Sequence, residues 1–309
     1  EREGEGLRQA NEVFGYTRLM VAAFGLGAGL AALEKAVAYS KQRRQFGTFL
    51  AEKQGYTHKL LVPNSVRLAA AQAYIEYVAD LLDSGTTDRQ VEGSIAKLFA
   101  TEAGNAAADH AVQALGGYGY CVDFEVEKIR RDARILTIYE GTSEIQQSII
   151  NIFRMRELVR SKGRFYESLA AEVEPLADAG GPAVARAARF LADAAQVAFR
   201  AKLVRQQHVA FEFATAMTEV ETAVALARAA TVKHDDLMQA QSRIWASQVA
   251  MGVPARVLSA MSGAGGVSPD DLARLQREGD LDGAVALQAG RLADMNVVAE
   301  RLTGFKTAE

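Results

Sequence analysis

The sequence has very little cysteine and proline, with one cysteine, Cys121, and five prolines in 309 residues. A single cysteine excludes an intrachain disulfide and favours a reducing compartment. We therefore expect a cytoplasmic protein, or a protein of the mitochondrial matrix if its source is eukaryotic. We also expect Cys121, which follows a glycine turn, to be a small buried residue. So few prolines favour long helices, because proline interrupts a helix interior.

The sequence also lacks an excess of charge and a long apolar run. There are 35 Lys and Arg against 38 Asp and Glu, which gives a formal net charge of −3. This balance suggests neither a nucleic-acid partner nor a basic membrane face. The longest apolar run, Met20–Leu33, covers 14 residues, whereas roughly 20 are needed to span a bilayer. We expect no membrane association, and no signal peptide is evident.

Metal-ligand spacing is also absent. The histidines His58, His110, His208 and His234 are scattered along the chain. Structural zinc sites place their ligands in short, recurrent spacings, which these residues do not show. We expect no metal site.

The sequence is instead rich in apolar residues, which make up 49% of it, and they recur with a helical period in six or more long segments. No segment shows the alternation of a strand. We expect an all-α protein in two domains. The first, residues 1–158, is an up-down bundle of the four-helix type, and the second, residues 159–309, is another helical bundle.

The expected helices are bounded by glycine, proline and capping residues. Pro63 should kink the second helix, and Gly25, Gly27 and Gly29 should let another helix approach the first one closely. Residues 45–51 and 263–266 are expected to be loops, residues 84–88 a turn with an N-cap candidate, and residues 177–182 a seam. The expected helices cover about residues 6–43, 52–84, 89–115, 125–134, 142–162, 183–205, 206–232, 236–261, a short segment after Ser268, and 282–302.

Three short segments break the helical pattern. The first is Arg43-Arg44-Gln45-Phe46-Gly47 at the end of the first helix. Cations at a helix C-terminus are expected from the helix dipole alone. The alternative is an anion site, in which guanidinium groups bind a diphosphate.

The second segment, Gln113–Tyr120, has three glycines in four residues. One glycine would suffice to end a helix. The additional glycines leave bare backbone that a flat ligand or another chain can approach. No strand precedes the segment, so it is not a Rossmann phosphate loop. Tyr118 and Tyr120 could pack or line a ligand.

The third segment is Ile138–Gln146. Thr142 or Ser143 can cap a helix, and Glu144 in the first turn suits the helix dipole. Capping does not explain Glu140, which precedes the helix among apolar residues. Apolar surroundings disfavour the charged form of a carboxylate, which is the condition for a general base that works near neutral pH.

Together and in this order, these segments resemble the acyl-CoA dehydrogenase family over about residues 5–156. The resemblance also includes Phe14-Gly-Tyr-Thr17-Arg18 and Arg131-Asp-Ala-Arg134. It corresponds to the family's C-terminal helical domain. Residues beyond about 160 look similar to the additional helical domain of very-long-chain dehydrogenases and acyl-CoA oxidases. We expect that part to serve packing or a subunit interface, with a membrane-surface role as the alternative.

The resemblance implies FAD and an acyl-CoA substrate, and it assigns roles to individual residues. Glu140 would be the catalytic base that removes the substrate's α-proton. Thr142 and Glu144 would reach the diphosphate and ribose of FAD, and Arg43 and Gln45 would bind the diphosphate with Phe46 beside them. Gln113, Gly116 and Gly117 would contact the adenosine part of a neighbouring subunit's FAD, and Phe14, Arg18 and Gly141 would contact the acyl-CoA.

The implied reaction is the α,β-dehydrogenation of an acyl-CoA thioester to the 2-enoyl-CoA, with electrons passed to an electron-transfer flavoprotein. The alternatives are an acyl-CoA oxidase, which passes electrons to oxygen, and a non-catalytic assembly subunit with the same fold. Family members also have an N-terminal helical domain and a β-domain that covers the flavin. We therefore expect a homo-oligomer that is active only with that other half, supplied by the same precursor or by a separate chain.

Overall fold

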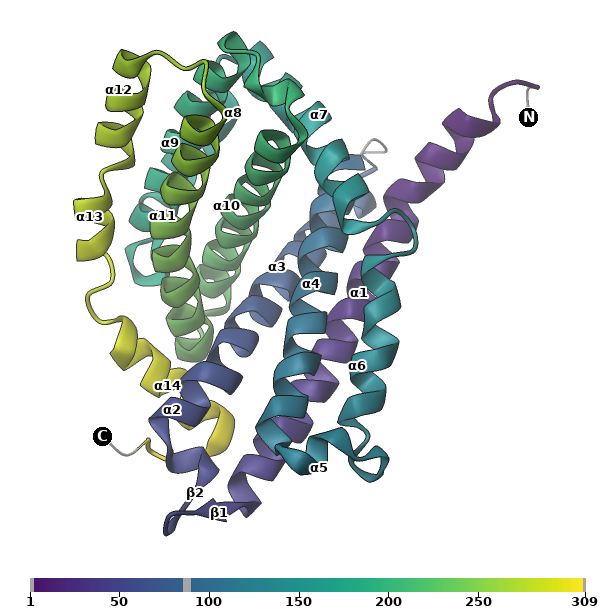
Figure 1. The fold of residues 1–309 in the computed structure, drawn as a ribbon, viewed down its shortest axis with the longest axis vertical. Coiled ribbons are helices and arrows are strands. Elements are labelled where there is room, and N and C mark those ends of the chain that lie inside the picture. The colour runs from purple at the N-terminus through teal and green to yellow at the C-terminus, as the bar shows by residue number, and fades with distance from the viewer. Residues whose placement is uncertain (1–2, 86–89, 308–309) are drawn as a thin grey trace. The chain divides into compact units, whose positions relative to one another are not determined.

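A computed structural model describes residues 3–85 and 90–307. Helices form nearly all of it (Figure 1), which confirms the predicted all-α fold. The chain divides into two compact units. Unit 1 is Glu1–Ser143 together with Leu292–Glu309, and unit 2 is Glu144–Arg291.

Unit 1 is a helical bundle in which α1, α3, α4 and α6 pack against one another. The predicted bounds of α1 and α6 and the predicted end of α4 agree with the structure within one residue, whereas the predicted helix 52–84 is divided into three segments, the last of which, α3, begins at Val62. The expected cap near residue 88 and the predicted start of α4 at Arg89 lie outside the described residues. The elements are α1 (Gly6–Gln42), β1 (Arg44–Gln45), β2 (Thr48–Phe49), η1 (Leu50–Glu52), α2 (Gln54–Tyr56), η2 (Thr57–Leu61), α3 (Val62–Asp83), α4 (Gln90–Leu115), α5 (Gly117–Tyr120), η3 (Val122–Phe124), α6 (Val126–Arg134), η4 (Ile135–Thr137) and α14 (Arg291–Thr303).

Glycines allow α1 and α4 to approach closely. A Cβ at Gly25 would lie 2.8 Å from the Cα of Thr101, and one at Gly29 would lie 2.9 Å from the Cα of Gly104. Such distances leave no room for a side chain, so these two glycines set the spacing of the helices. Gly27 differs from the prediction, because a Cβ there would meet nothing within 4 Å. It lies on the exposed side of α1.

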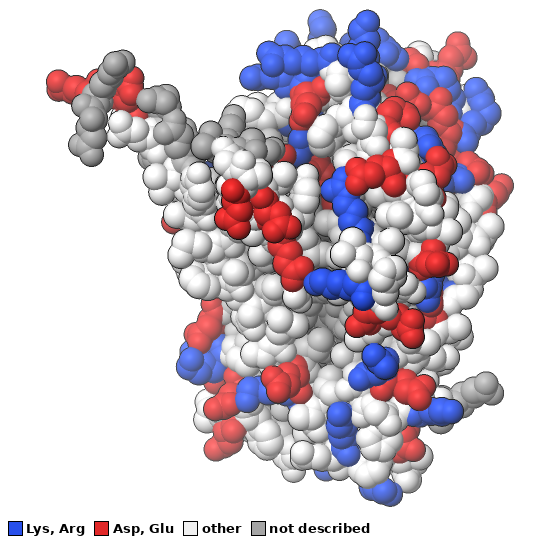
Figure 2. All heavy atoms as spheres, turned by 180° about the vertical axis from the view of Figure 1, so that it is seen from behind, with Lys and Arg blue, Asp and Glu red and all other residues white. Residues whose placement is uncertain are grey.

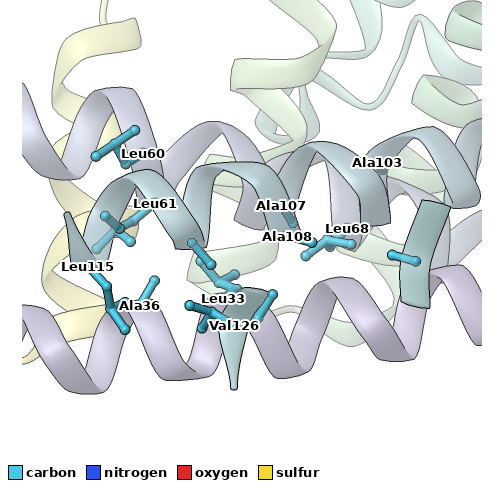
Figure 3. Packing of buried hydrophobic residues seen from close by; sticks show 14 residues of the cluster. Leu33, Ala36, Leu60, Leu61, Leu68, Ala103, Ala107, Ala108, Leu115 and Val126 are labelled. Carbon is cyan, nitrogen blue, oxygen red and sulfur yellow. The ribbon is translucent and has the colours of Figure 1, made fainter. Parts of the chain in front are cut away.

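The core of this bundle is made of small and branched apolar side chains. Leu33 and Ala36 of α1 pack with Leu68 of α3 and Ala107 of α4 (Figure 3). Alanines on α4 complement the leucines on its neighbours, so the helices can lie close together. This close packing fixes the relative positions of residues on α1 and α4.

Residues 45–51, predicted as a loop, contain a short antiparallel hairpin. Arg44 pairs with Phe49 and Gln45 pairs with Thr48. The two turn residues, Phe46 and Gly47, have φ values of 53° and 86°, and positive φ at both positions matches the twist of a tight hairpin. Strands of two residues are too short to show alternation in the sequence.

The irregularity predicted at Pro63 is present as a π turn. Residues 57–61 form a π-helical segment, and Val62 donates its backbone N–H to the Thr57 carbonyl. Pro63 then occupies the first turn of α3, where a missing N–H is tolerated.

Helix α1 contains the one candidate membrane span in the described residues. Its segment Val13–Gln42 is long and apolar enough to cross a bilayer by length and composition. This segment is longer than the apolar run Met20–Leu33, because small and polar residues interrupt the run without ending the helix. One side of α1 is packed against α4, and the buried Arg18 lies within the segment. A helix in the core of a bundle passes the same test.

Unit 2 is a second bundle, in which α9, α10 and α11 pack together. Helix α8 was not predicted, and the predicted helix 183–205 ends early at Arg200. The predicted helix 282–302 is two helices, separated near Gly290, which has a φ of 81° and so stops the first one. The elements are α7 (Ser143–Arg160), α8 (Arg164–Val173), η5 (Ala177–Ala179), α9 (Gly181–Arg200), η6 (Leu203–Arg205), α10 (Gln207–Lys233), α11 (Asp236–Ala264), α12 (Pro269–Gly279) and α13 (Leu281–Ala286).

The last helix, α14, returns to unit 1. The ring nitrogen Nε2 of His58 lies 2.9 Å from Oδ1 of Asn296, and the rings of Phe49 and Phe305 are 5.3 Å apart. Leu302 packs on the core of unit 1. The two compact units therefore do not follow the predicted division at residues 158/159, because side chains after residue 291 contact β2, η2 and the core of unit 1.

Basic side chains gather at one end of unit 2. Gln196 of α9 donates to the Leu158 carbonyl at 2.9 Å, which brings the α7–α8 and α9–α10 turns to the same end. Figure 2 shows a concentration of Lys and Arg at one end of its view. The balanced net charge of the sequence therefore conceals a local basic surface. The exposed cations of these turns are Arg160, Lys162, Arg164, Lys202 and Arg205.

Candidate active site and cofactor cavity

The loop after α6 presents Glu140 to α1. Its carboxylate oxygen Oε2 accepts a hydrogen bond of 3.0 Å from the Thr17 hydroxyl. Glu140 has a φ of 57° and Gly141 a φ of 88°, so the chain makes a left-handed turn here. Such a conformation in a non-glycine residue is uncommon and often marks a functional position.

Arg18 is the cation beside this carboxylate. It is only 6% exposed, and its Nη1 donates to the Ser94 hydroxyl at 3.3 Å. Its Nε has no hydrogen-bond partner among the described residues. Burial lowers the pKa of the Arg18 guanidinium, and the charge of Glu140 opposes this change. The glycines between α1 and α4 explain the contact, since they bring Ser94 next to Arg18.

Helix α4 holds the loop at both ends. At its beginning, Asn105 donates to the Ala133 carbonyl at 2.8 Å. At its end, Lys97 donates from its ammonium group to the Gly141 carbonyl at 2.8 Å. Both donors are buried on the same side of α4, two turns apart. The segment that carries Glu140 is therefore anchored to the bundle core.

The surroundings of Glu140 differ from the predicted apolar setting. Ile135, Ile138 and Tyr139 are exposed on the chain surface, because the loop turns their side chains away from the bundle. A hydroxyl and a guanidinium face the half-buried carboxylate instead. Burial and the charge of Glu140 both raise the pKa of Tyr139.

The remaining predicted residues near the loop occupy varied positions. Phe14 is half-buried, and the guanidinium of Arg18 lies 5.7 Å from the centre of its ring. Thr142 is half-buried, whereas Glu144 is exposed in the first turn of α7. Ser143 donates to Glu102 at 2.6 Å. The structure thus brings Phe14, Arg18, Glu140 and Gly141 together in unit 1.

A separate cavity of about 530 Å³ lies at the other end of α1. Five residues predicted to bind FAD line it together: Arg43, Gln45, Gln113, Gly116 and Gly117. A Cβ at Gly116 or Gly117 would meet nothing within 4 Å, so their backbone is open to a ligand. The volume is in the range of small-molecule sites. The other lining residues are Tyr39, Leu50, Tyr56, Leu60, Ala114, Leu115 and Tyr118.

Two tyrosines shape the wall of this cavity. Tyr56 donates from its hydroxyl to the Ala114 carbonyl at 3.2 Å, and burial raises its pKa, so it keeps its proton. Tyr118 stacks on Phe124 with ring centres 4.8 Å apart. The glycine turn is therefore supported by side chains on both sides.

Two side chains near the cavity project into solvent. Phe46, at the hairpin turn, is 95% exposed and does not line the cavity. Cys121 is exposed, which corrects the prediction that it is buried. The short turn after α5 lies at the surface and leaves its thiol uncovered. Among the described residues, no group of His, Cys, Asp and Glu could hold a metal ion.

The cavity and the Glu140 loop are far apart along α1. Thr17 contacts Glu140, whereas Tyr39 lines the cavity. At 1.5 Å per residue, a helix places these two positions roughly 33 Å apart. The residues predicted to bind FAD therefore form two groups in one chain rather than a single site.

Sequence reasoning missed the side chains that support the loop. Thr17, Ser94, Lys97 and Asn105 received no role, although each makes a hydrogen bond to the loop or to Arg18. For the three residues on α4, a pattern in the sequence could have indicated the role. Ser94, Lys97, Thr101 and Asn105 are spaced so that they form a polar stripe on one face of an alanine-rich helix.

Comparisons with known proteins point to one family for the first half of the chain. The family described as acyl-CoA dehydrogenase, C-terminal domain, matches residues 4–152. An acyl-CoA dehydrogenase of Bacillus subtilis is 45% identical over 150 residues, which are 48% of this chain and 39% of that protein. The caffeyl-CoA reductase-Etf complex subunit CarC of Acetobacterium woodii is 37% identical over 147 residues, 48% of this chain and 38% of that protein.

A solved structure extends the similarity of fold to nearly the whole chain. The acyl-CoA dehydrogenase from Bacillus anthracis, complexed with FAD, matches with a TM-score of 0.80 and 20% identity, covering 97% of this chain and 57% of that one. This match concerns the fold alone. The chain covers less than half the length of the two relatives compared by sequence. Residues 4–152 of this chain belong to the acyl-CoA dehydrogenase family and form its C-terminal domain.

Proposed function

We propose that this chain is the C-terminal half of an FAD-dependent acyl-CoA dehydrogenase, with Glu140 as the catalytic base. The observation that carries the proposal is the position of Glu140. It lies within the part of the chain that matches the family, on a strained turn, with its carboxylate beside Thr17 and Arg18. This arrangement directs a single carboxylate from a rigid support, as a general base requires.

The chain's own residues would perform the proton transfer. Glu140 takes the α-proton of the acyl-CoA thioester, while Thr17 holds one carboxylate oxygen in place. The buried Arg18 lies beside this carboxylate and supplies a positive charge to the site. The backbone N–H of Glu140 would donate to the thioester carbonyl and so make the α-proton easier to remove. Bound FAD would supply the acceptor for the β-hydride.

The cavity fits the adenosine diphosphate part of FAD. Arg43 provides a guanidinium for phosphate oxygens, and Gln45 and Gln113 provide amide donors and acceptors. The bare backbone of Gly116 and Gly117 leaves space for a flat group to approach. Arginine, amide and open backbone are the groups that such a ligand would need.

Thr17 at the loop and Tyr39 at the cavity lie roughly 33 Å apart along α1, which we take to imply two cofactors. One FAD, even when extended, is too short to lie in the cavity and also place its ring beside Glu140 of the same chain. We infer that the cavity binds the FAD whose ring serves a neighbouring subunit. This inference extends the predicted role of Gln113, Gly116 and Gly117 to Arg43 and Gln45, and it requires a homo-oligomer.

The proposed enzyme also needs a second half, an electron acceptor and a cell compartment. A half that carries the flavin-covering β-domain would complete the enzyme, from the same precursor or from a separate chain. The relative from Acetobacterium woodii is a subunit of a complex with an electron-transfer flavoprotein, which supports such a protein as the electron acceptor. The single cysteine favours the cytoplasm, or the mitochondrial matrix in a eukaryote.

The test is Glu140→Gln in the FAD-loaded holoenzyme. This variant keeps the size of the side chain but cannot accept a proton at neutral pH. We expect flavin reduction by a series of saturated acyl-CoAs, from butyryl-CoA to palmitoyl-CoA, to fall by about 10²- to 10⁴-fold, with FAD still bound. Wild-type flavin reduction in Glu140→Gln contradicts the proposal. Rapid oxygen consumption by the reduced wild-type enzyme would favour an oxidase instead.

A further inference from the structure

The turn at Glu140 has to be held in place. In a non-glycine residue, a left-handed backbone costs on the order of 1–3 kcal/mol and persists where surrounding contacts determine it. Glu140 is in this conformation, and Gly141 follows with a positive φ as well. The contacts of the next peptide group therefore decide where the carboxylate points.

Lys97 makes such a contact from inside the bundle. Its side chain is completely buried, and its ammonium group donates to the Gly141 carbonyl at 2.8 Å. A buried ammonium is costly unless it is hydrogen-bonded. The bond thus satisfies Lys97 and fixes the carbonyl directly after Glu140.

The position of Lys97 on α4 links the loop to the wall of the site. Ser94, one turn earlier on α4, accepts the hydrogen bond from Arg18. The Lys97 ammonium and the Ser94 hydroxyl therefore hold the loop and Arg18 from one rigid helix. Close packing of α1 on α4 at Gly25 and Gly29 limits any shift of one helix relative to the other. Movement of the Gly141 carbonyl would alter the line between Glu140 and Thr17.

We propose that Lys97 is a positioning residue for Glu140, holding through the Gly141 carbonyl the turn that directs the carboxylate towards Thr17 and Arg18. The inference rests on the proposed function, because it gives Lys97 a role in the reaction only if Glu140 is the base. Lys97 is completely buried and acts on Glu140 through the Gly141 carbonyl. Its loss should slow the proton transfer and leave ligand binding in place.

The experiment compares Lys97→Met, Lys97→Gln and Thr101→Val with the wild type. Met has a similar length but no donor, and Gln keeps an N–H donor on a shorter, neutral side chain. Thr101 is the matched control, because it is buried on the same helix and its hydroxyl bonds within α4, to the Lys97 carbonyl at 2.8 Å. Valine has nearly the same shape as threonine.

Two measurements separate positioning from general support of the fold. The first is the rate of flavin reduction by the acyl-CoA series in the holoenzyme. For Lys97→Met we expect a fall of about 10- to 100-fold at saturating substrate, because small misplacements of a reacting group have such effects. The substrate concentration at half-maximal rate should stay within about 3-fold. The FAD content should not change.

The second measurement needs no activity. Amide hydrogen exchange of residues 134–142, measured on the 309-residue chain, should be faster in Lys97→Met than in the wild type. Lys97→Gln should recover part of both the rate and the protection. Thr101→Val should match the wild type in both.

The outcomes distinguish this inference from the proposed function. If Glu140→Gln reduces flavin normally, the proposed function fails and takes the inference with it. If Glu140→Gln is inactive while Lys97→Met reduces flavin within about 2-fold of the wild type, only the inference is overturned. If Lys97→Met does not fold, Lys97→Gln decides, and wild-type rate and exchange in that variant also overturn the inference.

Discussion

Thr17 and Glu140 are 123 positions apart in the sequence, yet the threonine hydroxyl donates to the glutamate carboxylate at 3.0 Å. The contact joins the first helix of the family domain to the loop before its last one. Thr17 is half-buried and directly precedes the buried Arg18, so its hydroxyl lies beside the face of α1 that packs on α4. The Thr17 hydroxyl on α1 therefore helps to fix the position of one carboxylate oxygen of the proposed base.

Thr17→Val should slow flavin reduction without loss of the fold. A hydrogen bond to a charged group contributes about 1.5–3 kcal/mol, so we expect a rate about 10- to 100-fold lower. Thr17→Ser keeps the hydroxyl and should stay close to the wild type. Stopped-flow measurement of flavin reduction checks both variants. Equal rates for Thr17→Val and Thr17→Ser would show that the hydroxyl has no part in the reaction.

Arg43→Ala should weaken FAD binding, because Arg43 lines the cavity. Loss of a charged hydrogen-bonding group should lower the affinity by about 10- to 100-fold. The neighbouring Arg44 is the matched control. It does not line the cavity, and its guanidinium lies 4.1 Å from the centre of the Phe49 ring. Titration of the apoprotein with FAD measures both, and equal losses for the two arginines would argue against a diphosphate site in the cavity.

Gly104→Ala should destabilise unit 1, whereas Gly27→Ala should stabilise it. A Cβ at position 104 would collide with the backbone of Gly25, and overpacking of this kind costs about 1–3 kcal/mol. Position 27 has open space, so alanine there should gain about 0.5–1 kcal/mol from its helix propensity. Urea denaturation gives both values. A stabilising effect at position 104 would mean that α1 and α4 are farther apart than described.

His58 should make stability depend on pH. Burial lowers the pKa of His58, and the hydrogen bond with Asn296 opposes part of this change. The unfolded imidazole, with a pKa of about 6.5, therefore binds a proton more readily than the folded one. Stability that is present above about pH 6.5 should be lost as the pH falls below this value. In His58→Gln, the loss of thermal stability between about pH 7.5 and pH 5.5 should be smaller.

Hydrogen exchange locates this effect. The amides of residues 292–307 should lose protection at low pH in the wild type and lose less in His58→Gln, because His58 contacts Asn296. Identical pH dependence in the two proteins would show that His58 is not the responsible group.

Helix positions were predictable because their signals are local. Gly6 and Gln42 bound α1 within one residue of the predicted range, since apolar period and terminal cations lie within the segment itself. The faces of α1 were less predictable. Gly25 and Gly29 meet α4 but Gly27 does not, and this difference depends on how the partner helix is placed.

The candidate site was predictable only in part. Glu140 and the cavity residues stood out because they interrupt helices with unusual residue types. Lys97 did not, because a lysine within a helical segment ordinarily lies at the surface. Its burial follows from the packing of α4 between α1 and α3. The apolar setting expected for Glu140 was wrong for the same reason, since neighbours in sequence need not be neighbours in space.

The return of α14 to unit 1 has a consequence for synthesis. Phe305 and Asn296 contact residues 49 and 58, which leave the ribosome more than 200 residues earlier. Residues 144–291 are therefore an insertion between the two segments of unit 1. The entropy cost of closing such a long loop grows only with the logarithm of its length. Translation must pass through all of unit 2 before the bundle of unit 1 receives α14, so unit 1 can be completed only after unit 2 has been made.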